Sequence, residues 1–288
     1  MRIEGQRESD NVEDVRGSRF GRGAGLGCGG VLIALVIAAL TGQDPAQILQ
    51  LVGLVSQATQ QQAPSPESAG APADTLGKFA SVVLASTEDE WSKVFAQAGR
   101  SYTPPKLVLF TQSVPSACGM SSSATGPFYC PEDRKVYIDL SFFDELARRF
   151  RAPGDFAQAY VIAHEVGHHV QNLLGISGKV EQMRERMSKR DANALSVRVE
   201  LQADCFAGVW ANRANAAGGG KVIGEQDVEQ ALTAASAIGD DRLQRQAQGR
   251  VVPDSFTHGT SDQRMRWFTI GLESGDPRKC DTFRADRL

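Results

Sequence analysis

The sequence has little excess charge of either sign and few of the residues that most often carry chemistry. Its 288 residues have a formal net charge of −3, which gives no reason to expect a nucleic-acid partner. Only four histidines and five cysteines are present. With 41% apolar and 23% charged residues, the composition otherwise suits a globular protein with one good-sized core and some extra segments. The scarcity of histidine makes the spacing of the few that occur informative.

Cysteine is also too scarce for a dense disulfide framework. Cys28 lies in an apolar run, which leaves Cys118, Cys130, Cys205 and Cys280 for the rest of the chain. An even number is compatible with two disulfides in an oxidising compartment, and four buried free thiols are the alternative. The sequence does not give the connectivity, although pairing Cys118 with Cys130 and Cys205 with Cys280 closes the shorter loops.

Charge is absent from one stretch near the N-terminus, the eighteen residues from Gly23 to Leu40. A helix of this length can just cross the hydrocarbon of a bilayer, so we expect one transmembrane helix over 23–41. A cleaved signal peptide is the alternative. Arginines precede the stretch, whereas no Lys or Arg occurs between Gly23 and Lys78. The positive-inside bias therefore predicts that residues 1–22, in which we expect no core, form a cytoplasmic tail.

The segment 42–73 has the composition of a connection rather than of a folded unit. A short amphipathic stretch at 45–56, which could lie on a membrane or pack on the domain, precedes residues rich in Gln, Ala, Pro and Ser. Such a composition cannot bury a core, so we expect a disordered linker. The folded domain is then expected over 74–288, on the extracytoplasmic side.

The most informative stretch is His164-Glu165-Val166-Gly167-His168, which fits the pattern H-E-x-x-H. At this chain's residue frequencies roughly 0.003 matches are expected by chance. On a helix the pattern puts two imidazoles on one face, which suits a zinc ion with an open position for water, and Glu165 can take a proton from that water. The alternative is a helix with two surface or core histidines. His169 points away from His168 on a helix, so we do not expect it to share the metal.

A third zinc ligand is predicted on a second helix, expected over 194–216. Glu200 and Asp204 lie four residues apart among small apolar residues, where an unpaired carboxylate would be costly. Zinc bound by Glu200, with Asp204 accepting the free N–H of a ligating histidine, would account for both. The alternative is a solvent-facing pair or a salt bridge with Arg198 or Arg213. Weaker ligand candidates lie on a charged segment typical of a solvated helix: Glu181 and Glu185.

The remaining pattern predicts an α+β domain that is mainly helical with a small sheet. Strands are expected at 106–110 and 135–140, and the second should form the edge of a cleft and pair with an extended peptide. Two helical patterns follow residue 74, and another helix is expected over 225–238. Loops are expected at 116–131 and 239–253.

Near the C-terminus, Ser261 is expected to cap a helix that carries Arg264. This cap would hold His258 at the N-terminal end of the helix. We predict that His258 or Arg264 reaches the cleft and stabilises the oxyanion that develops during hydrolysis.

Taken together, H-E-x-x-H at 164–168 and Glu200-Leu201-Gln202-Ala203-Asp204 resemble the gluzincin arrangement of zinc metallopeptidases. The segment 8–14, the Cys-Pro at 130–131 and the segment 258–261 are similar to the bacterial neutral zinc metallopeptidase family. The resemblance implies a zincin-like domain with zinc at His164, His168 and Glu200, and Glu165 as the catalytic acid and base.

These observations predict a zinc-dependent metalloendopeptidase, anchored in the bacterial inner membrane by one helix and acting on a peptide or protein substrate. Two alternatives remain. One is a zinc hydrolase of a non-peptide amide such as cell-wall material, and the other is a noncatalytic binding module stabilised by metal. Glu165 argues against the second, because a structural zinc site has a fourth ligand and no use for a base.

Overall fold

The computed structural model describes residues 1, 5–17, 70–123, 126–220 and 222–288. The transmembrane helix expected over 23–41, the stretch at 45–56 and nearly all of the linker lie outside these residues. Among the helices of the described part of the chain, none is long and apolar enough to cross a membrane.

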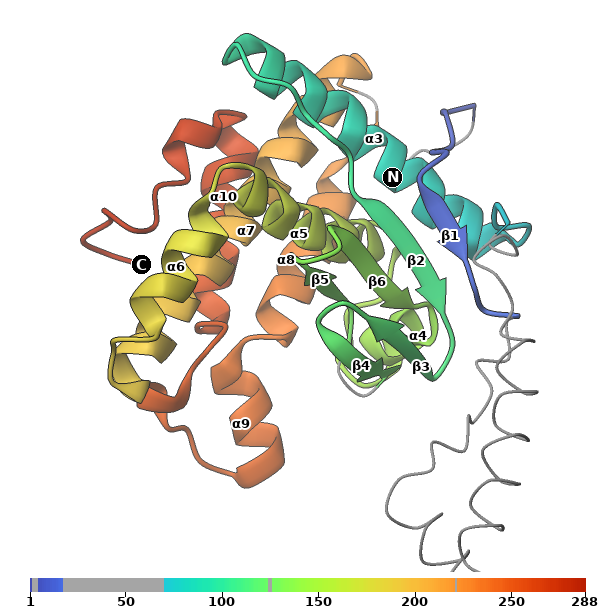
Figure 1. Cartoon of the computed structure of the whole chain (residues 1–288). Coiled ribbons are helices and arrows are strands. Elements are labelled where there is room, and N and C mark those ends of the chain that lie inside the picture. The colour runs from blue at the N-terminus through green and yellow to red at the C-terminus, as the bar shows by residue number, and fades with distance from the viewer. Residues whose placement is uncertain (2–4, 18–69, 124–125, 221) are drawn as a thin grey trace, which may run out of the picture. The chain divides into compact units, whose positions relative to one another are not determined.

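The described residues form a four-stranded sheet and a mainly helical remainder, as the α+β expectation requires (Figure 1). The strand order is β1-β2-β6-β5, with parallel β1–β2 and β2–β6 pairs and an antiparallel β5–β6 pair. The strands are β1 (Val12–Asp14), β2 (Lys106–Phe110), β6 (Lys135–Asp139) and β5 (Phe128–Cys130). The strands predicted at 106–110 and 135–140 are therefore confirmed.

The edge of the sheet differs from the expectation. β6 is internal, because β2 and β5 occupy its two sides, so it has no free side for a peptide. The edge strand next to β6 is β5, which lies in the segment expected to be a loop, and β1 is the other edge. The ring of Phe128 in β5 stacks on that of Tyr137 in β6 with centroids 4.8 Å apart. The same segment contains most of a hairpin of β3 (Ser113–Ser116) and β4 (Gly119–Ser122). These strands have three or four residues each, too few to show an alternating pattern.

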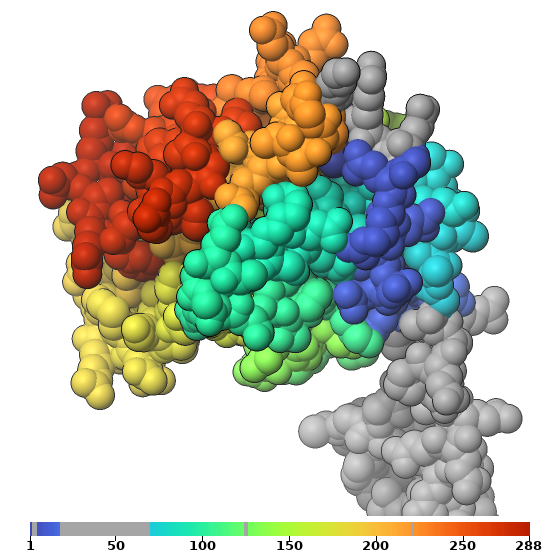
Figure 2. Space-filling model, turned by 90° about the horizontal axis from the view of Figure 1, so that it is seen from above, coloured from blue at the N-terminus to red at the C-terminus, as the bar shows by residue number. Residues whose placement is uncertain are grey.

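The expectation that residues 1–22 contribute nothing to a core is wrong for β1. Val12 is buried, and residues 1–14 belong to the same compact unit as residues 71–288. Glu13 reaches the lysines of two other strands, with oxygen to Nζ distances of 2.6 Å to Lys106 and 2.7 Å to Lys135. Figure 2 shows the N-terminal segment lying against the next helix, where the Ser9 hydroxyl donates to Glu88.

This pairing has a consequence for topology. Two strands joined by main-chain hydrogen bonds cannot lie on opposite sides of a bilayer. A chain whose residues 1–22 lay on the other side of a bilayer from the domain could therefore not form the β1–β2 pair.

Eight α-helices complete the described part of the chain. Their bounds are α3 (Thr75–Gln97), α4 (Ser141–Arg148), α5 (Asp155–Leu173), α6 (Ile176–Arg184), α7 (Lys189–Ala217), α8 (Glu225–Ala237), α9 (Asp240–Gln248) and α10 (Ser261–Ser274). The two helical patterns after residue 74 are one helix, α3, whose N-terminus Asp74 caps by accepting from the Leu76 and Gly77 amides. The segment 239–253 was expected to be a loop but contains α9, a largely exposed helix with few apolar residues. The cap of α10 is Thr260, one residue before the Ser261 expected.

The core is built where α5, α7 and α10 pack together (Figure 1). Glycines allow the close approach of α7 and α10. A Cβ on Gly208 would overlap the Phe268 carbonyl, and one on Gly271 would overlap the Cys205 carbonyl. The Cys205–Cys280 disulfide ties the C-terminal segment to α7, and Cys118–Cys130 closes the other predicted pair.

Candidate metal centre

The predicted metal-binding helix is α5, and its histidine face lies against α7. Gly167, between the two motif histidines, permits this contact, because a Cβ there would meet the Ala203 main chain at 3.0–3.1 Å. The glycine within the motif thus allows α7 to bring its carboxylates close to the imidazoles.

Within the described residues, one group of side chains is arranged to hold a metal ion: His164, His168 and Glu200. One potential ligand atom from each lies within 4.8 Å of the others. His164 Nε2 is 3.2 Å from Glu200 Oε2, and His168 Nε2 is 3.5 Å from Glu200 Oε1. The structure therefore brings together the three residues that the sequence predicted as ligands.

The donor set fits zinc. Two imidazole nitrogens and a carboxylate form a three-ligand set typical of catalytic zinc sites, which leaves one position open. In both histidines the other ring nitrogen has a partner: Nδ1 of His164 is 2.8 Å from Asp204 Oδ1, and Nδ1 of His168 is 2.9 Å from Gln171 Oε1. An N–H donated to these oxygens leaves both Nε2 lone pairs free for a cation.

Asp204 is fully buried and holds His164 as expected. The Tyr160 hydroxyl donates to its Oδ1 at 2.5 Å, and Arg264 Nε donates to its Oδ2 at 2.8 Å. Burial alone would raise the pKa of Asp204, but the charges of Arg264 and His164 outweigh it and lower the pKa. The aspartate is therefore ionised and can orient the imidazole.

The electrostatics of the ligands agree with a site built for a cation. Burial lowers the pKa of His164, but Asp204 and Glu200 oppose it and raise the pKa to about 10. Burial also raises the pKa of Glu200, and the two histidines reverse the shift and lower it well below the ordinary value. Without metal, a proton takes the place of the cation, so metal binding requires its release.

Glu165 is buried beside the ligands with 7% of its surface exposed. Burial raises its pKa, while the neighbouring histidines lower it in part. A carboxyl whose pKa is raised by burial holds a proton more readily than an exposed one, which suits a group that must accept a proton and return it.

Arg264 and His258 lie in different surroundings. Arg264 is 2% exposed, and its guanidinium is bound to Asp204 through two nitrogens and to the Tyr160 hydroxyl, so it supports the ligand helices. His258 lines the cleft, and its Nδ1 is 3.2 Å from Asp240 Oδ1. The other oxygen of Asp240 accepts the main-chain amides of residues 257–259, which fixes this loop.

A cleft of about 1270 Å³ lies over the metal centre. The edge strand β5 contributes Phe128 and Tyr129 to one wall, and α9 contributes Leu243 and Ala247. The same cleft is lined by the predicted ligands and by Glu165, His258 and Arg264, although the Arg264 guanidinium is bound to Asp204.

Other predicted candidates lie elsewhere. His169 is fully buried, its Nε2 donates to the Thr103 carbonyl and its Nδ1 faces the Tyr129 hydroxyl, so it does not share the metal. Burial lowers the pKa of His169 to about 4. Glu181 lines the outer cleft and is exposed, and Glu185 is exposed as well.

Sequence reasoning missed several residues that shape the site: Tyr160, Gln171, Gln202 and Asp240. Tyr160 could have been found from its spacing, because it lies one helical turn before His164 on the same face. The two glutamines and Asp240 carry no such signal.

Comparisons with known proteins identify the family of the chain. The model of the family described as "Putative neutral zinc metallopeptidase" matches residues 1–283. The chain belongs to this family. The "Uncharacterized protein YpfJ" of Escherichia coli strain K12 is 51% identical over 292 residues, covering 98% of this chain and 99% of the relative. The "Uncharacterized protein Rv2575" of Mycobacterium tuberculosis strain H37Rv is 42% identical over 219 residues, 73% of each chain. No solved structure matches.

Proposed function

We propose that this protein is a zinc-dependent endopeptidase. The observation that carries the proposal is the convergence of His164 and His168 on α5 with Glu200 on α7, beside a buried Glu165. Zinc held by these three residues would supply a Lewis acid that polarises a carbonyl and lowers the pKa of a water molecule.

The chain's own residues supply the rest of the chemistry. Glu165 accepts the proton of the attacking water and returns it to the departing amine, a task that its raised pKa favours. The Asp240 carboxylate accepts from Nδ1 of His258 and raises the pKa of this ring, so that the protonated imidazolium can donate from Nε2 to the oxyanion in the cleft. Arg264 keeps Asp204 in place, and Asp204 keeps His164 in place.

The position of β5 favours a peptide substrate. It is the edge strand beside β6 and contributes Phe128 and Tyr129 to the cleft wall. An extended peptide can hydrogen-bond to such an edge and pass over the metal centre. A non-peptide amide would make no use of the edge.

The test is the variant Glu165→Gln, assayed by digestion of casein and of a peptide library with and without chelator. It should bind zinc as the wild type does and lose about 10²-fold or more of its hydrolysis, because the general base is removed. Glu185→Gln is the matched control, since that glutamate is exposed and lies outside the cleft. Undiminished peptide cleavage by Glu165→Gln would refute the role of Glu165, and chelator-resistant cleavage by the wild type would refute the zinc mechanism.

We also propose that the domain lies outside the cytoplasm, as part of a membrane-anchored protein. Two disulfides in the described residues support an oxidising compartment, and the uncharged residues 23–40 support an anchor. Because β1 pairs with β2, this proposal puts the N-terminal strand outside the cytoplasm as well, so the chain between the two strands would have to enter the membrane and return to the same side rather than cross it once.

A further inference from the structure

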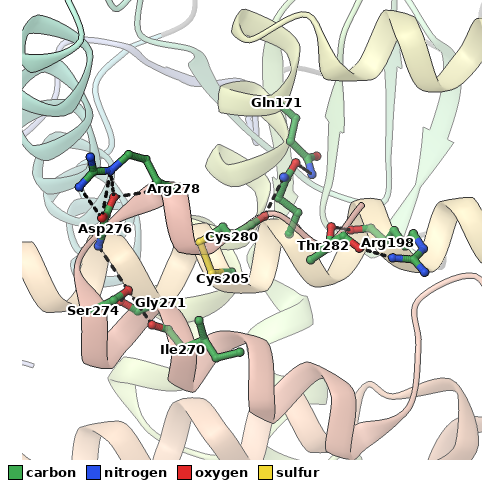
Figure 3. The surroundings of a disulfide bond; sticks show 11 residues. Gln171, Arg198, Cys205, Ile270, Gly271, Ser274, Asp276, Arg278, Cys280 and Thr282 are labelled. Carbon is green, nitrogen blue, oxygen red and sulfur yellow. Dashed lines mark hydrogen bonds and ion pairs between the residues drawn. A yellow bond between two sulfur atoms is a disulfide. The ribbon is translucent and has the colours of Figure 1, made fainter. Parts of the chain in front are cut away.

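A line of hydrogen bonds joins the second histidine of the motif to the C-terminal disulfide. Gln171 Oε1 faces Nδ1 of His168 at 2.9 Å, and Gln171 Nε2 donates to Gln202 Oε1 at 3.1 Å. Gln202 Nε2 then donates to the Cys280 carbonyl at 2.8 Å. Figure 3 shows the two ends of this part of the line, Gln171 and the Cys205–Cys280 disulfide.

We propose that Gln171 is a positioning residue that fixes the ring and the tautomer of His168, and that Gln202 and the Cys205–Cys280 disulfide hold Gln171 in its orientation. The inference rests on the proposed zinc site, and it assigns a role in that site to the C-terminal segment.

The direction of each bond follows from the fixed acceptors. Two main-chain carbonyls, those of Val199 and Cys280, can only accept. The Cys280 carbonyl requires the amide nitrogen of Gln202, so the Gln202 oxygen faces Gln171. That oxygen and the Val199 carbonyl, 2.8 Å from Gln171 Nε2, both require the amide nitrogen of Gln171.

The only atom that Gln171 then offers to His168 is an oxygen. An oxygen that accepts requires the proton of His168 on Nδ1, which leaves Nε2 as the free lone pair. Nε2 is the nitrogen that faces Glu200. Two main-chain carbonyls thus determine, through two amides, the tautomer that a metal ligand needs.

Burial makes this line of bonds rigid. Gln171 is fully buried, Gln202 is 5% exposed and Cys280 is 1% exposed, so water cannot replace a lost partner without cost. His164 is held differently, since its partner is the carboxylate of Asp204. Gln171 is the corresponding partner for the second ligand.

The disulfide holds the last acceptor of the line. Cys205 follows Asp204 directly on α7, so the bond to Cys280 fixes the C-terminal segment next to the ligand helix. Two further contacts hold the same segment: Thr282 Oγ1 donates to the Arg198 carbonyl at 2.6 Å, and Arg198 donates to the Thr282 carbonyl (Figure 3).

The experiment measures the zinc dissociation constant by chelator competition in the full chain. Gln171→Met keeps the length of the side chain and removes its polar atoms, and we expect zinc to bind about 10- to 100-fold more weakly. Gln202→Met keeps Gln171 but removes the oxygen that accepts its amide N–H, so we expect zinc affinity to fall by a smaller factor than in Gln171→Met. Gln158→Met is the matched control on α5, because no hydrogen bond joins Gln158 to a ligand, and it should bind zinc as the wild type does.

The disulfide is tested in the same assay. The double variant Cys205→Ala with Cys280→Ala should lose zinc affinity, whereas Cys118→Ala with Cys130→Ala should retain it, because that disulfide lies on the hairpin and β5. Circular dichroism of the metal-free proteins identifies any variant that fails to fold. If Gln171→Met fails to fold, the zinc affinity of Gln202→Met tests the positioning role instead.

The outcomes separate this inference from the proposed function. Wild-type affinity in folded Gln171→Met, or in folded Gln202→Met if Gln171→Met does not fold, overturns the positioning role even if the wild type is an active zinc enzyme. A wild type that does not bind zinc overturns the proposed function itself.

Discussion

The buried carboxylate of Asp204 accepts hydrogen bonds from three side chains, and one of them, Arg264, contributes most to compensating its charge. His164 and Tyr160 donate to one of its oxygens, and Arg264 contacts both. Arg264 is the partner with a permanent positive charge, and it is itself buried. Removal of the guanidinium would take away the donor to Oδ2 and leave the protonated His164, which Glu200 also contacts, as the remaining positive partner of the buried carboxylate.

We therefore expect Arg264→Met to destabilise the metal-free protein by about 3–5 kcal/mol, as measured by urea denaturation. Arg266→Met is the matched control on the same helix, because Arg266 is exposed, and it should change stability little. Equal stability of the two variants would show that Arg264 does not support Asp204.

Among single residues, the sequence alone identified those that a metal site requires to be of a particular type at a particular spacing. Two histidines four apart around a glutamate are rare by chance, and a carboxylate pair four apart on an apolar helix is costly unless a cation or a donor compensates it. Gln171, Gln202 and Asp240 could not be found in this way. Amide side chains and single aspartates are common on any surface, and only the packing of α7 against α5 and of residues 257–259 on α9 gives these residues their roles.

The crossing of α7 and α10 depends on glycine at both helices. A methyl group on Gly271 would overlap the Cys205 carbonyl, whereas Gly178 on α6 has open space around it. Both are helical glycines, so they give a matched pair for the same substitution.

We expect Gly271→Ala to lower stability by about 1–3 kcal/mol, because the two helices must move apart. Gly178→Ala should be neutral or stabilising by up to about 1 kcal/mol, because alanine favours the helix and meets no neighbour. Thermal unfolding checks both. A Gly271→Ala protein as stable as the wild type would show that the close approach is not required.

Elements were predictable where the pattern was long. The helix of the motif, the long ligand helix and the two five-residue strands emerged from apolar periodicity. β1 and β5 could not be found in this way, because each has three residues. β1 also lies in a stretch of mixed charge, and its Glu13 looks solvated until Lys106 and Lys135 from two other strands are placed beside it.

At the scale of the molecule, two segments far apart in the sequence lie in the same folded unit. Residues 1–14 and 71–288 pack as one body, and β1 is hydrogen-bonded to β2. The charge bias considers only the flanks of an apolar stretch, so it carries no information on the pairing of β1, which precedes the stretch, with β2, which follows it.

We expect Asp10 and the domain to be on the same side of the membrane. In a chain carrying Cys28→Ser, single reporters at Asp10→Cys and Met120→Cys, both on exposed positions, would be treated in intact cells with a membrane-impermeant maleimide. Both should be labelled if the domain is extracytoplasmic, and neither if it is cytoplasmic. Labelling of one reporter without the other would contradict the pairing of β1 with β2 in the cell.

The central claim is that two imidazoles of α5 and one carboxylate of α7 hold a single zinc ion. Anomalous diffraction at the zinc edge, from crystals of the full chain grown with zinc, tests it most directly. The account predicts one strong peak about 2.0–2.2 Å from His164 Nε2, His168 Nε2 and a carboxylate oxygen of Glu200. A zinc peak at other residues, or one near the histidines with the Glu200 carboxylate turned away, would contradict it.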